Sequence, residues 1–263
     1  MLLDGLRSRF GRQKPPREAT TGGALIYAIG DIHGRSDLLD QLVDMIQDDA
    51  RVLGHHHRPV LLFIGDYVDR GGDSRGVVDR LLALEKNPEL DVRTLKGNHE
   101  QQMLAFLDHA SEGPPWAEFG GAATLASYGV TPPAPRSDAT AWEEARMSFS
   151  NAVAGEHLAF FKRLELAVVC GDYLFVHAGV RPGIPLAAQS EQDLLWIRED
   201  FLSASEPFER VVVHGHTPEL TPYIGRNRIG IDTGAYATAT LTAVRLLGTG
   251  REVIQTTSPR RQK

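Results

Sequence analysis

Apolar runs and helical stripes alternate along the first hundred residues of the chain. Short apolar, β-branched runs predict three buried strands, at Leu25–Ile29, Val60–Ile64 and Val92–Leu95. Apolar residues at helical spacing predict a helix after each strand, at Ser36–Arg51, Ser74–Glu85 and Glu100–His109. Ser36 and Ser74 are expected to be the N-caps of the first two helices. This β-α-β-α-β order is typical of a parallel sheet with right-handed crossovers.

The pattern changes in the middle of the chain and becomes strand-rich after it. Glycines and prolines divide residues 110–161 into a helical insertion, with helices expected near Gly121–Tyr128, Ala139–Ala152 and Glu156–Arg163. We expect the insertion to overhang the functional site and Trp116 to lie near the mouth of its pocket. Six further strands are predicted, at Leu166–Cys170, Tyr173–Val176, Val211–Val213, Arg228–Ile231, Thr240–Leu246 and Val253–Gln255. The two halves predict an α/β (α+β) fold whose two sheets form a central sandwich flanked by helices.

Length, composition and charge limit the kinds of protein that this chain can be. A chain of 263 residues, 42% hydrophobic and 24% charged, is typical of one globular domain, which we place at residues 23–257. Residues 1–22 are expected to form a flexible basic tail and residues 258–263 a second tail. A formal charge of −6 argues against a nucleic-acid partner. The single cysteine, Cys170, excludes an internal disulfide and a thiolate metal cluster.

Hydropathy bears on location. No apolar run approaches the roughly 18 residues that a membrane span requires. The first residues also lack the apolar core of a secretory signal, because arginines interrupt them. A cytoplasmic location is therefore expected, and the oligomeric state cannot be read from the sequence.

Five short segments carry the chemistry. They read GDIHG at Gly30–Gly34, GDYVDRG at Gly65–Gly71, GNHE at Gly97–Glu100, VHAG at Val176–Gly179 and HGHTP at His214–Pro218. A lone Asp or His after a strand is as readily a cap or a turn residue. Five segments that agree, each with glycine and most of them following an apolar run, instead predict a pair of metal ions.

The ligands divide between two cations. One cation would be bound by Asp31, His33 and Asp66, and the other by Asp66, Asn98, His177 and His216. Such mixed oxygen and nitrogen ligands suit Mn, Fe or Zn. Two such ions about 3.5–4 Å apart can hold a bridging hydroxide and orient a phosphate for in-line attack.

The segments resemble the phosphoprotein phosphatase family of the calcineurin-like metallophosphoesterases. That family has the pattern GDxHG, GDxVDRG and GNHE, followed by two later histidine ligands, and the resemblance runs from about Leu25 to Leu246. It looks closest to the bacterial and phage lambda-type serine/threonine protein phosphatases. The resemblance implies a central β-sandwich and two divalent metal ions, most often manganese.

The resemblance also implies roles for residues beside the ligands. His99 matches the general acid and Asp69 its carboxylate partner, and an Asp-paired imidazolium can protonate a leaving alkoxide. Arg70 and Arg198 match phosphate-binding arginines, Asn98 lies beside the phosphate, and Arg181 is a weaker third candidate arginine. Guanidinium groups orient phosphate well, although a helix-surface salt bridge is the alternative role for Arg198.

Three functions remain open from the sequence. The first is a serine/threonine protein phosphatase that attacks directly with the bridging hydroxide, and small aryl phosphates would also be substrates. The second is a dinucleoside tetraphosphate hydrolase, or a nucleotide or small-molecule phosphatase, on the same scaffold. Symmetrical tetraphosphate hydrolases tend to lack the counterpart of Asp69 and to have Asp in place of Glu100. The third is a non-catalytic binding module, which the complete ligand set argues against.

One position separates the chain from diesterase relatives. Many phosphodiesterases of the superfamily carry a further histidine two positions after the last ligand histidine, in the pattern G-H-x-H. Pro218 occupies that place here. This departure favours a phosphomonoester, in a phosphorylated protein or a small molecule, as the substrate.

Overall fold

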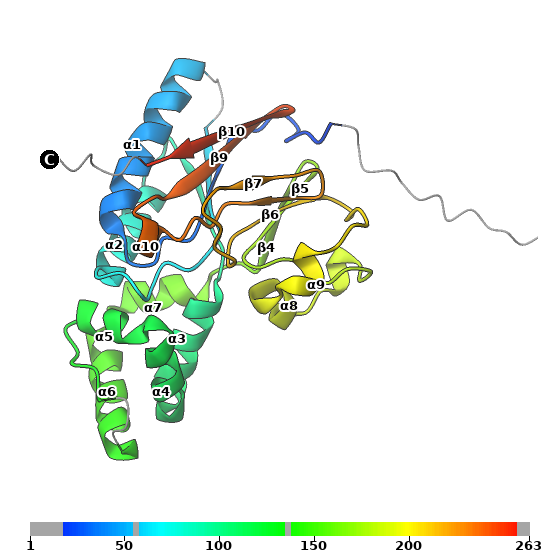
Figure 1. The fold of residues 1–263 in the computed structure, drawn as a ribbon. Coiled ribbons are helices and arrows are strands. Elements are labelled where there is room, and N and C mark those ends of the chain that lie inside the picture. Colours follow the sequence, from blue (N-terminus) through cyan, green and yellow to red (C-terminus); the bar gives the residue numbers. More distant parts are fainter. Residues whose placement is uncertain (1–17, 55–57, 135–137, 257–263) are drawn as a thin grey trace, which may run out of the picture.

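The computed structural model describes residues 18–54, 58–134 and 138–256. Within these residues the strands form two five-stranded sheets, which Figure 1 shows packed against each other with helices outside. The expected α/β sandwich is thus confirmed. The tail predicted at residues 1–22 lies outside the described residues up to residue 17, and the tail predicted at residues 258–263 lies entirely outside them.

The first sheet has the order β10-β9-β1-β2-β3. Its strands are β1 (Ile26–Ile29), β2 (Val60–Phe63), β3 (Asp91–Thr94), β9 (Thr242–Leu247) and β10 (Gly250–Gln255). β1, β2 and β3 run parallel, as the alternating pattern predicts, while β9 pairs antiparallel with both β1 and β10. The last two strands of the chain therefore complete the sheet that the first three begin.

The second sheet has the order β4-β5-β6-β8-β7. Its strands are β4 (Ala167–Cys170), β5 (Tyr173–Val176), β6 (Val211–His214), β7 (Tyr223–Ile224) and β8 (Arg228–Gly230). β5, β6 and β8 are parallel to one another. The short edge strand β7 was not predicted, because its two residues are too few to show a pattern and both are exposed.

Alternation along β1 shows how the sandwich is held together. Ile26 and Ala28 point into the apolar core between the sheets, where they join residues such as Phe175 and Val213. Tyr27 and Ile29 point to the opposite face and join the core beneath the outer helices. The period of two that places them there is the ordinary geometry of a strand buried on both faces.

Helices cover the outer faces and build the insertion. They are α1 (Ser36–Leu53), α2 (Ser74–Glu85), α3 (Asn98–Asp108), α4 (Gly113–Trp116), α5 (Ala122–Ser127), α6 (Ala139–Ala152), α7 (Gly155–Lys162), α8 (Glu191–Trp196), α9 (Glu199–Leu202) and α10 (Ala235–Thr238). Figure 1 shows α3 to α7 gathered at one end of the sandwich. Among the residues that the structure describes, none of the helices combines the length and apolar character that a bilayer crossing requires.

The first two helices begin at the predicted residues, Ser36 and Ser74, but both predicted N-caps are wrong. Arg35 occupies the N-cap of α1 and makes no side-chain cap, while the Ser36 hydroxyl donates to Asp73 Oδ2 at 2.5 Å. Asp73, not Ser74, caps α2, because its Oδ1 accepts the Gly76 N–H at 2.9 Å. Asp and Ser are about equally good N-caps, so adjacent candidates cannot be separated by residue type.

The third helix begins earlier than predicted. α3 starts at Asn98 instead of Glu100, with Gly97 at the N-cap. Glu100 reaches back and accepts the Gly97 N–H at 2.9 Å, which fixes the first turn. As a result Asn98 and His99 both lie in that first turn, directed toward the end of the sandwich.

Candidate functional site

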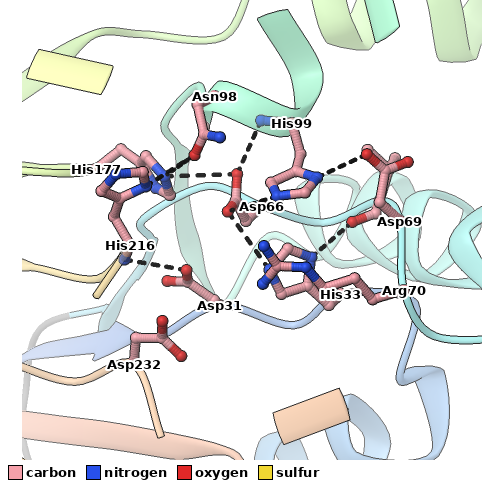
Figure 2. A network of polar contacts seen from close by, with 12 residues as sticks. Asp31, His33, Asp66, Asp69, Arg70, Asn98, His99, His177, His216 and Asp232 are labelled. Atoms are coloured by element: carbon pink, nitrogen blue, oxygen red, sulfur yellow. Dashed lines mark hydrogen bonds and ion pairs between the residues drawn. The ribbon is translucent and has the colours of Figure 1, made fainter. Parts of the chain in front are cut away.

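The predicted metal ligands gather at one edge of the sandwich. Asp31 follows β1, Asp66 follows β2 and Asn98 follows β3, while His177 follows β5 and His216 follows β6. Because β1, β2 and β3 are parallel, and β5 and β6 are parallel, each sheet delivers its ligands at the same strand ends. Figure 2 shows these side chains pointing toward one another.

Asp66 stands at the centre of the cluster. Its Oδ2 lies 3.4 Å from His33 Nε2, and its Oδ1 lies 3.5 Å from His177 Nε2. Two groups of side chains able to hold an ion share it, one formed with His33 and His99 and the other with His177 and His216. A carboxylate shared in this way can bridge two cations.

The donor atoms around Asn98 fit a cation. His177 Nδ1 lies 2.9 Å from the Ile64 carbonyl oxygen and donates its proton there, which leaves the lone pair of Nε2 facing Asn98 Oδ1 at 2.8 Å. His216 Nδ1 lies 2.9 Å from the same oxygen. Two acceptors repel at such a separation, whereas ligands bonded to one ion at about 2.1 Å naturally lie about 3 Å apart. The site is therefore built for a metal ion.

Buried polar atoms without partners lead to the same conclusion. Asp31 Oδ1 and His216 Nε2 are buried and make no hydrogen bond with any described residue. The other Asp31 oxygen, Oδ2, accepts the His216 backbone N–H at 3.0 Å, so the carboxylate is held in place. The orphaned carboxylate oxygen of Asp31 is costly unless an ion binds it, while His216 Nε2 would carry the ring proton when Nδ1, which faces Asn98 Oδ1, is the ligand.

Asp232 is a residue of the site that the sequence analysis missed. It follows β8, and Figure 2 shows its carboxylate beside Asp31. Burial, together with the charges of Asp232 and Asp66, raises the pKa of Asp31 well above its usual range. Burial also raises the pKa of Asp232 to about 6. Bound cations would offset this crowding of carboxylates, so Asp232 belongs to the electrostatics of the metal centre. Its position directly after a buried strand and before Thr-Gly is the signal that would have indicated it.

The backbone of the site is strained at the functional residues. Apart from Ala239, the described non-glycine residues with positive φ all belong to the site: His33 (46°), Asp66 (53°), Asp69 (72°), Arg70 (67°) and His216 (63°). Each such residue costs on the order of 1–3 kcal/mol, which the surrounding packing must offset. Because the strained residues gather at the site, we infer that the fold accepts unfavourable backbone angles there in order to place these side chains.

His33 is held as a neutral ligand. Its Nδ1 lies 2.8 Å from the Val68 carbonyl oxygen, to which it donates, and its Nε2 faces Arg70 Nη1 at 2.9 Å. Burial lowers the pKa of His33 to about 3. The Arg70 guanidinium in turn lies over the Tyr236 ring, 4.9 Å from its centroid. Arg70 is thereby fixed beside the first ligand group.

His99 and Asp69 form a buried pair. His99 Nδ1 lies 2.7 Å from Asp69 Oδ2, and His99 Nε2 lies 3.9 Å from Asp66 Oδ2. Burial acts to lower the pKa of His99, but the carboxylates of Asp66 and Asp69 outweigh it and raise that pKa above the usual value. An imidazolium that faces the ligand cluster with Nε2 has the arrangement that a general acid requires.

The three candidate arginines differ in placement. Arg70 touches His33, as described above. Arg198 Nη1 lies 3.4 Å from Thr217 Oγ1, next to His216, and its guanidinium is exposed. Arg181 instead pairs with Asp193 Oδ1 at 2.6 Å and with Asp200 Oδ2 at 3.0 Å. Arg70 and Arg198 thus lie beside the ligand cluster, whereas the Arg181 guanidinium is paired with two carboxylates.

Glu100 organises the loop that carries Asp66. Its buried carboxylate accepts the backbone N–H groups of Asp66 at 2.9 Å, Tyr67 at 2.8 Å and Val68 at 3.2 Å. Burial raises the pKa of Glu100 to about 7, the Asp66 charge acts in the same direction, and the N–H groups act against both. Glu100 therefore does not bind metal in this arrangement but holds the central ligand in its strained conformation.

Replacing Glu100 with Ala is expected to lower the free energy of unfolding by about 3 kcal/mol, because several buried N–H groups lose their acceptor. Urea denaturation of the wild type and the variant measures the difference. Glu89→Ala, at an exposed glutamate, is the control and should change stability by less than about 0.5 kcal/mol. Similar midpoints for the Glu100 variant and the wild type would show that the loop does not depend on this carboxylate.

The expected place of Trp116 is wrong. Its side chain is 0% exposed, so it cannot line the mouth of a pocket. Its Nε1 instead donates to Asp69 Oδ2 at 2.9 Å. The insertion therefore meets the site from behind the acid pair.

Comparisons with known proteins agree with this geometry. A family model described as calcineurin-like phosphoesterase matches residues 24–245. The asymmetrical bis(5'-nucleosyl)-tetraphosphatase PrpE of Anoxybacillus flavithermus is 24% identical over 244 residues, which cover 84% of this chain and 90% of that protein.

Two solved structures share the fold. A cold-active protein-tyrosine phosphatase of a psychrophilic Shewanella species has a TM-score of 0.57 and 15% identity, with 89% of this chain and 81% of that chain covered. A protein serine/threonine phosphatase of Saccharomyces cerevisiae has a TM-score of 0.52 and 17% identity, with 91% and 82% covered.

Proposed function

The chain belongs to the calcineurin-like phosphoesterase family. Within this family, we propose that it is a metal-dependent phosphomonoesterase that acts on phosphoserine and phosphothreonine in proteins. The observation that carries the proposal is the buried Asp69–His99 pair, whose Nδ1 to Oδ2 distance is 2.7 Å. An alkoxide is a poor leaving group and needs a proton. A His–Asp pair beside the ligand cluster can supply that proton to the leaving oxygen of a phosphoserine or phosphothreonine ester.

The metal centre has two parts in this proposal. Asp31, His33 and Asp66 would hold one divalent cation, and Asp66, Asn98, His177 and His216 the other. Manganese is proposed for both, with iron and zinc as the alternatives that the same ligands suit. When bound, the cations would supply Lewis-acid polarisation of the phosphate and an activated water.

The chain's own side chains would do the remaining work. Arg70 and Arg198 would bind the phosphate oxygens from the two sides of the cluster, because their guanidinium groups lie beside His33 and Thr217. His99 would hold a proton at Nε2 for the leaving oxygen, and Asp69 would keep its ring in that orientation. Asp232 would add a second negative charge beside Asp31 and so help to offset the positive charge of the bound cations, without touching the substrate.

A second candidate is an asymmetrical dinucleoside tetraphosphate hydrolase. It is favoured by the name of the PrpE relative, which matches over most of both chains. The two functions place different demands on His99. A nucleotide leaving from a tetraphosphate already departs as a stable phosphate anion, so it depends less on a proton from the enzyme than an alkoxide does.

A substrate panel on the manganese-loaded protein separates the two candidates. It compares phosphoserine and phosphothreonine peptides, a dinucleoside tetraphosphate, nucleotides and a bis-aryl phosphodiester by kcat/KM. The phosphopeptides are expected to lead by about tenfold or more, since a difference of 1.4 kcal/mol in transition-state binding suffices for this. A dinucleoside tetraphosphate that leads by the same margin would replace the first proposal with the second.

A further inference from the structure

Asp69 receives hydrogen bonds from two side chains of the helical insertion. Thr124 Oγ1 donates to Asp69 Oδ1 at 2.6 Å, and Trp116 Nε1 donates to Oδ2 at 2.9 Å. Thr124 Oγ1 also accepts the Asp69 backbone N–H at 2.8 Å. Asp69 is 0% exposed, so water does not compete for these positions. Both oxygens of the carboxylate are thus oriented by residues more than forty positions away in the chain.

The indole of Trp116 is tightly packed inside the insertion. The Trp116 ring lies 5.1 Å from the Phe106 ring and 5.7 Å from the Phe149 ring, measured between centroids. Gly121 approaches it so closely that a Cβ there would lie 2.4 Å from the ring. The apolar core of the insertion is therefore built around the indole, and the Trp116 N–H has one fixed direction.

We propose that Trp116 and Thr124 are positioning residues, which orient the Asp69 carboxylate so that His99 presents Nε2 to the leaving oxygen. This inference rests on the proposed function and assigns the insertion a part in catalysis. An indole N–H can only donate, so the oxygen that meets it must accept. Asp69 Oδ2 then accepts from His99 Nδ1 as well, and the His99 proton that remains available is the one on Nε2.

The chain offers a matched pair of tryptophans for the test. Trp142 lies in the same core, with its ring 6.2 Å from that of Phe106. It is 2% exposed, and its Nε1 makes no hydrogen bond with any described residue. Trp116→Phe removes the N–H that donates to Asp69, whereas Trp142→Phe removes an N–H without a partner among the described residues, and both variants retain an aromatic ring in the core.

The kinetic test compares phenyl phosphate, with a poor leaving group, and 4-nitrophenyl phosphate, with a good one. Trp116→Phe is expected to lower kcat on phenyl phosphate by about tenfold and on 4-nitrophenyl phosphate by less than about twofold, with KM unchanged. Thr124→Val should act in the same way, and Thr124→Ser should restore activity because it keeps the hydroxyl. Trp142→Phe should leave the ratio of the two rates unchanged. Equal losses on both substrates, or the same ratio in both tryptophan variants, would overturn the positioning role.

A second measurement does not depend on activity. Nitrogen-15 NMR of the imidazoles in the metal-free protein shows which ring nitrogen of His99 carries the proton. Trp116→Phe is expected to change the His99 signals, and Trp142→Phe is expected to leave them as in the wild type. If the wild type hydrolyses neither aryl phosphate, the proposed function fails while this comparison still decides the inference. His99 signals that stay unchanged in Trp116→Phe would refute the inference even in an active enzyme.

Discussion

Asp66→Asn is expected to lower kcat by on the order of a thousandfold on every phosphoester, good and poor leaving groups alike. Asp66 is the side chain that both candidate metal groups share, with oxygens 3.4 Å from His33 Nε2 and 3.5 Å from His177 Nε2. The amide keeps the shape but removes the negative charge and one of the two ligand oxygens. Loss of the several kcal/mol that a cation pair gives to the transition state corresponds to this factor.

Metal content and activity should fall together in that variant. Elemental analysis after dialysis against manganese measures the bound metal, and 4-nitrophenyl phosphate measures kcat. Asp91→Asn, at an exposed aspartate at the start of β3, is the matched control and should keep both. In the wild type, a chelator should abolish activity and manganese should restore it. Full activity in metal-stripped protein would exclude the dinuclear centre.

The ligand cluster could be predicted from the sequence because each ligand is recognised by its immediate neighbours in the chain. Each ligand follows a recognisable strand, and every ligand except His177 has a glycine as its direct neighbour, as Asp66 has Gly65. Parallel strands deliver such residues to one edge of a sheet, so strand order alone brings the ligands together. The resemblance to the metallophosphoesterases depended on the same short segments, and the family model and the sandwich confirm it.

The rest of the site depends on contacts between segments that are far apart in the chain. Nothing near Trp116 in the sequence indicates that its indole would meet Asp69, 47 positions earlier. Nor does the GNHE segment reveal that Glu100 accepts the N–H groups that follow β2. The positive φ at Asp69 and Arg70 is equally invisible, since Asp and Arg ordinarily avoid that region and only the folded surroundings impose it.

The same distinction explains the errors in local detail. Ser36 was expected to cap its own helix, yet its hydroxyl donates to the carboxylate of Asp73, the N-cap residue of α2. A capping hydroxyl must accept a backbone N–H, whereas Ser36 lies one residue after the N-cap and its hydroxyl points as a donor to a charged acceptor. Local propensity therefore predicted where the longer helices lie, but neither the residues that cap them nor the short helices α4, α8, α9 and α10.

His99→Asn is the change that should separate chemistry from binding. The variant is expected to lower kcat on phenyl phosphate by about 10²–10³-fold, within the range of general acid catalysis, and on 4-nitrophenyl phosphate by about tenfold or less. Phenoxide needs the proton that His99 Nε2 would supply, whereas nitrophenoxide leaves well without it. A loss of metal would instead affect both substrates equally, as in Asp66→Asn.

A matched histidine makes the result specific to the acid. His157 is also buried and paired with a carboxylate, since its Nε2 lies 3.0 Å from Asp79 Oδ1, but it joins Tyr128 in the insertion and lies outside the ligand cluster. His157→Asn should therefore leave the ratio of the two rates unchanged, while Asp69→Asn should reproduce the pattern of His99→Asn. Equal losses on both substrates in His99→Asn would count against His99 as the acid. The proton would then have to come from elsewhere, and the buried pair with Asp69 would serve only to hold the first turn of α3.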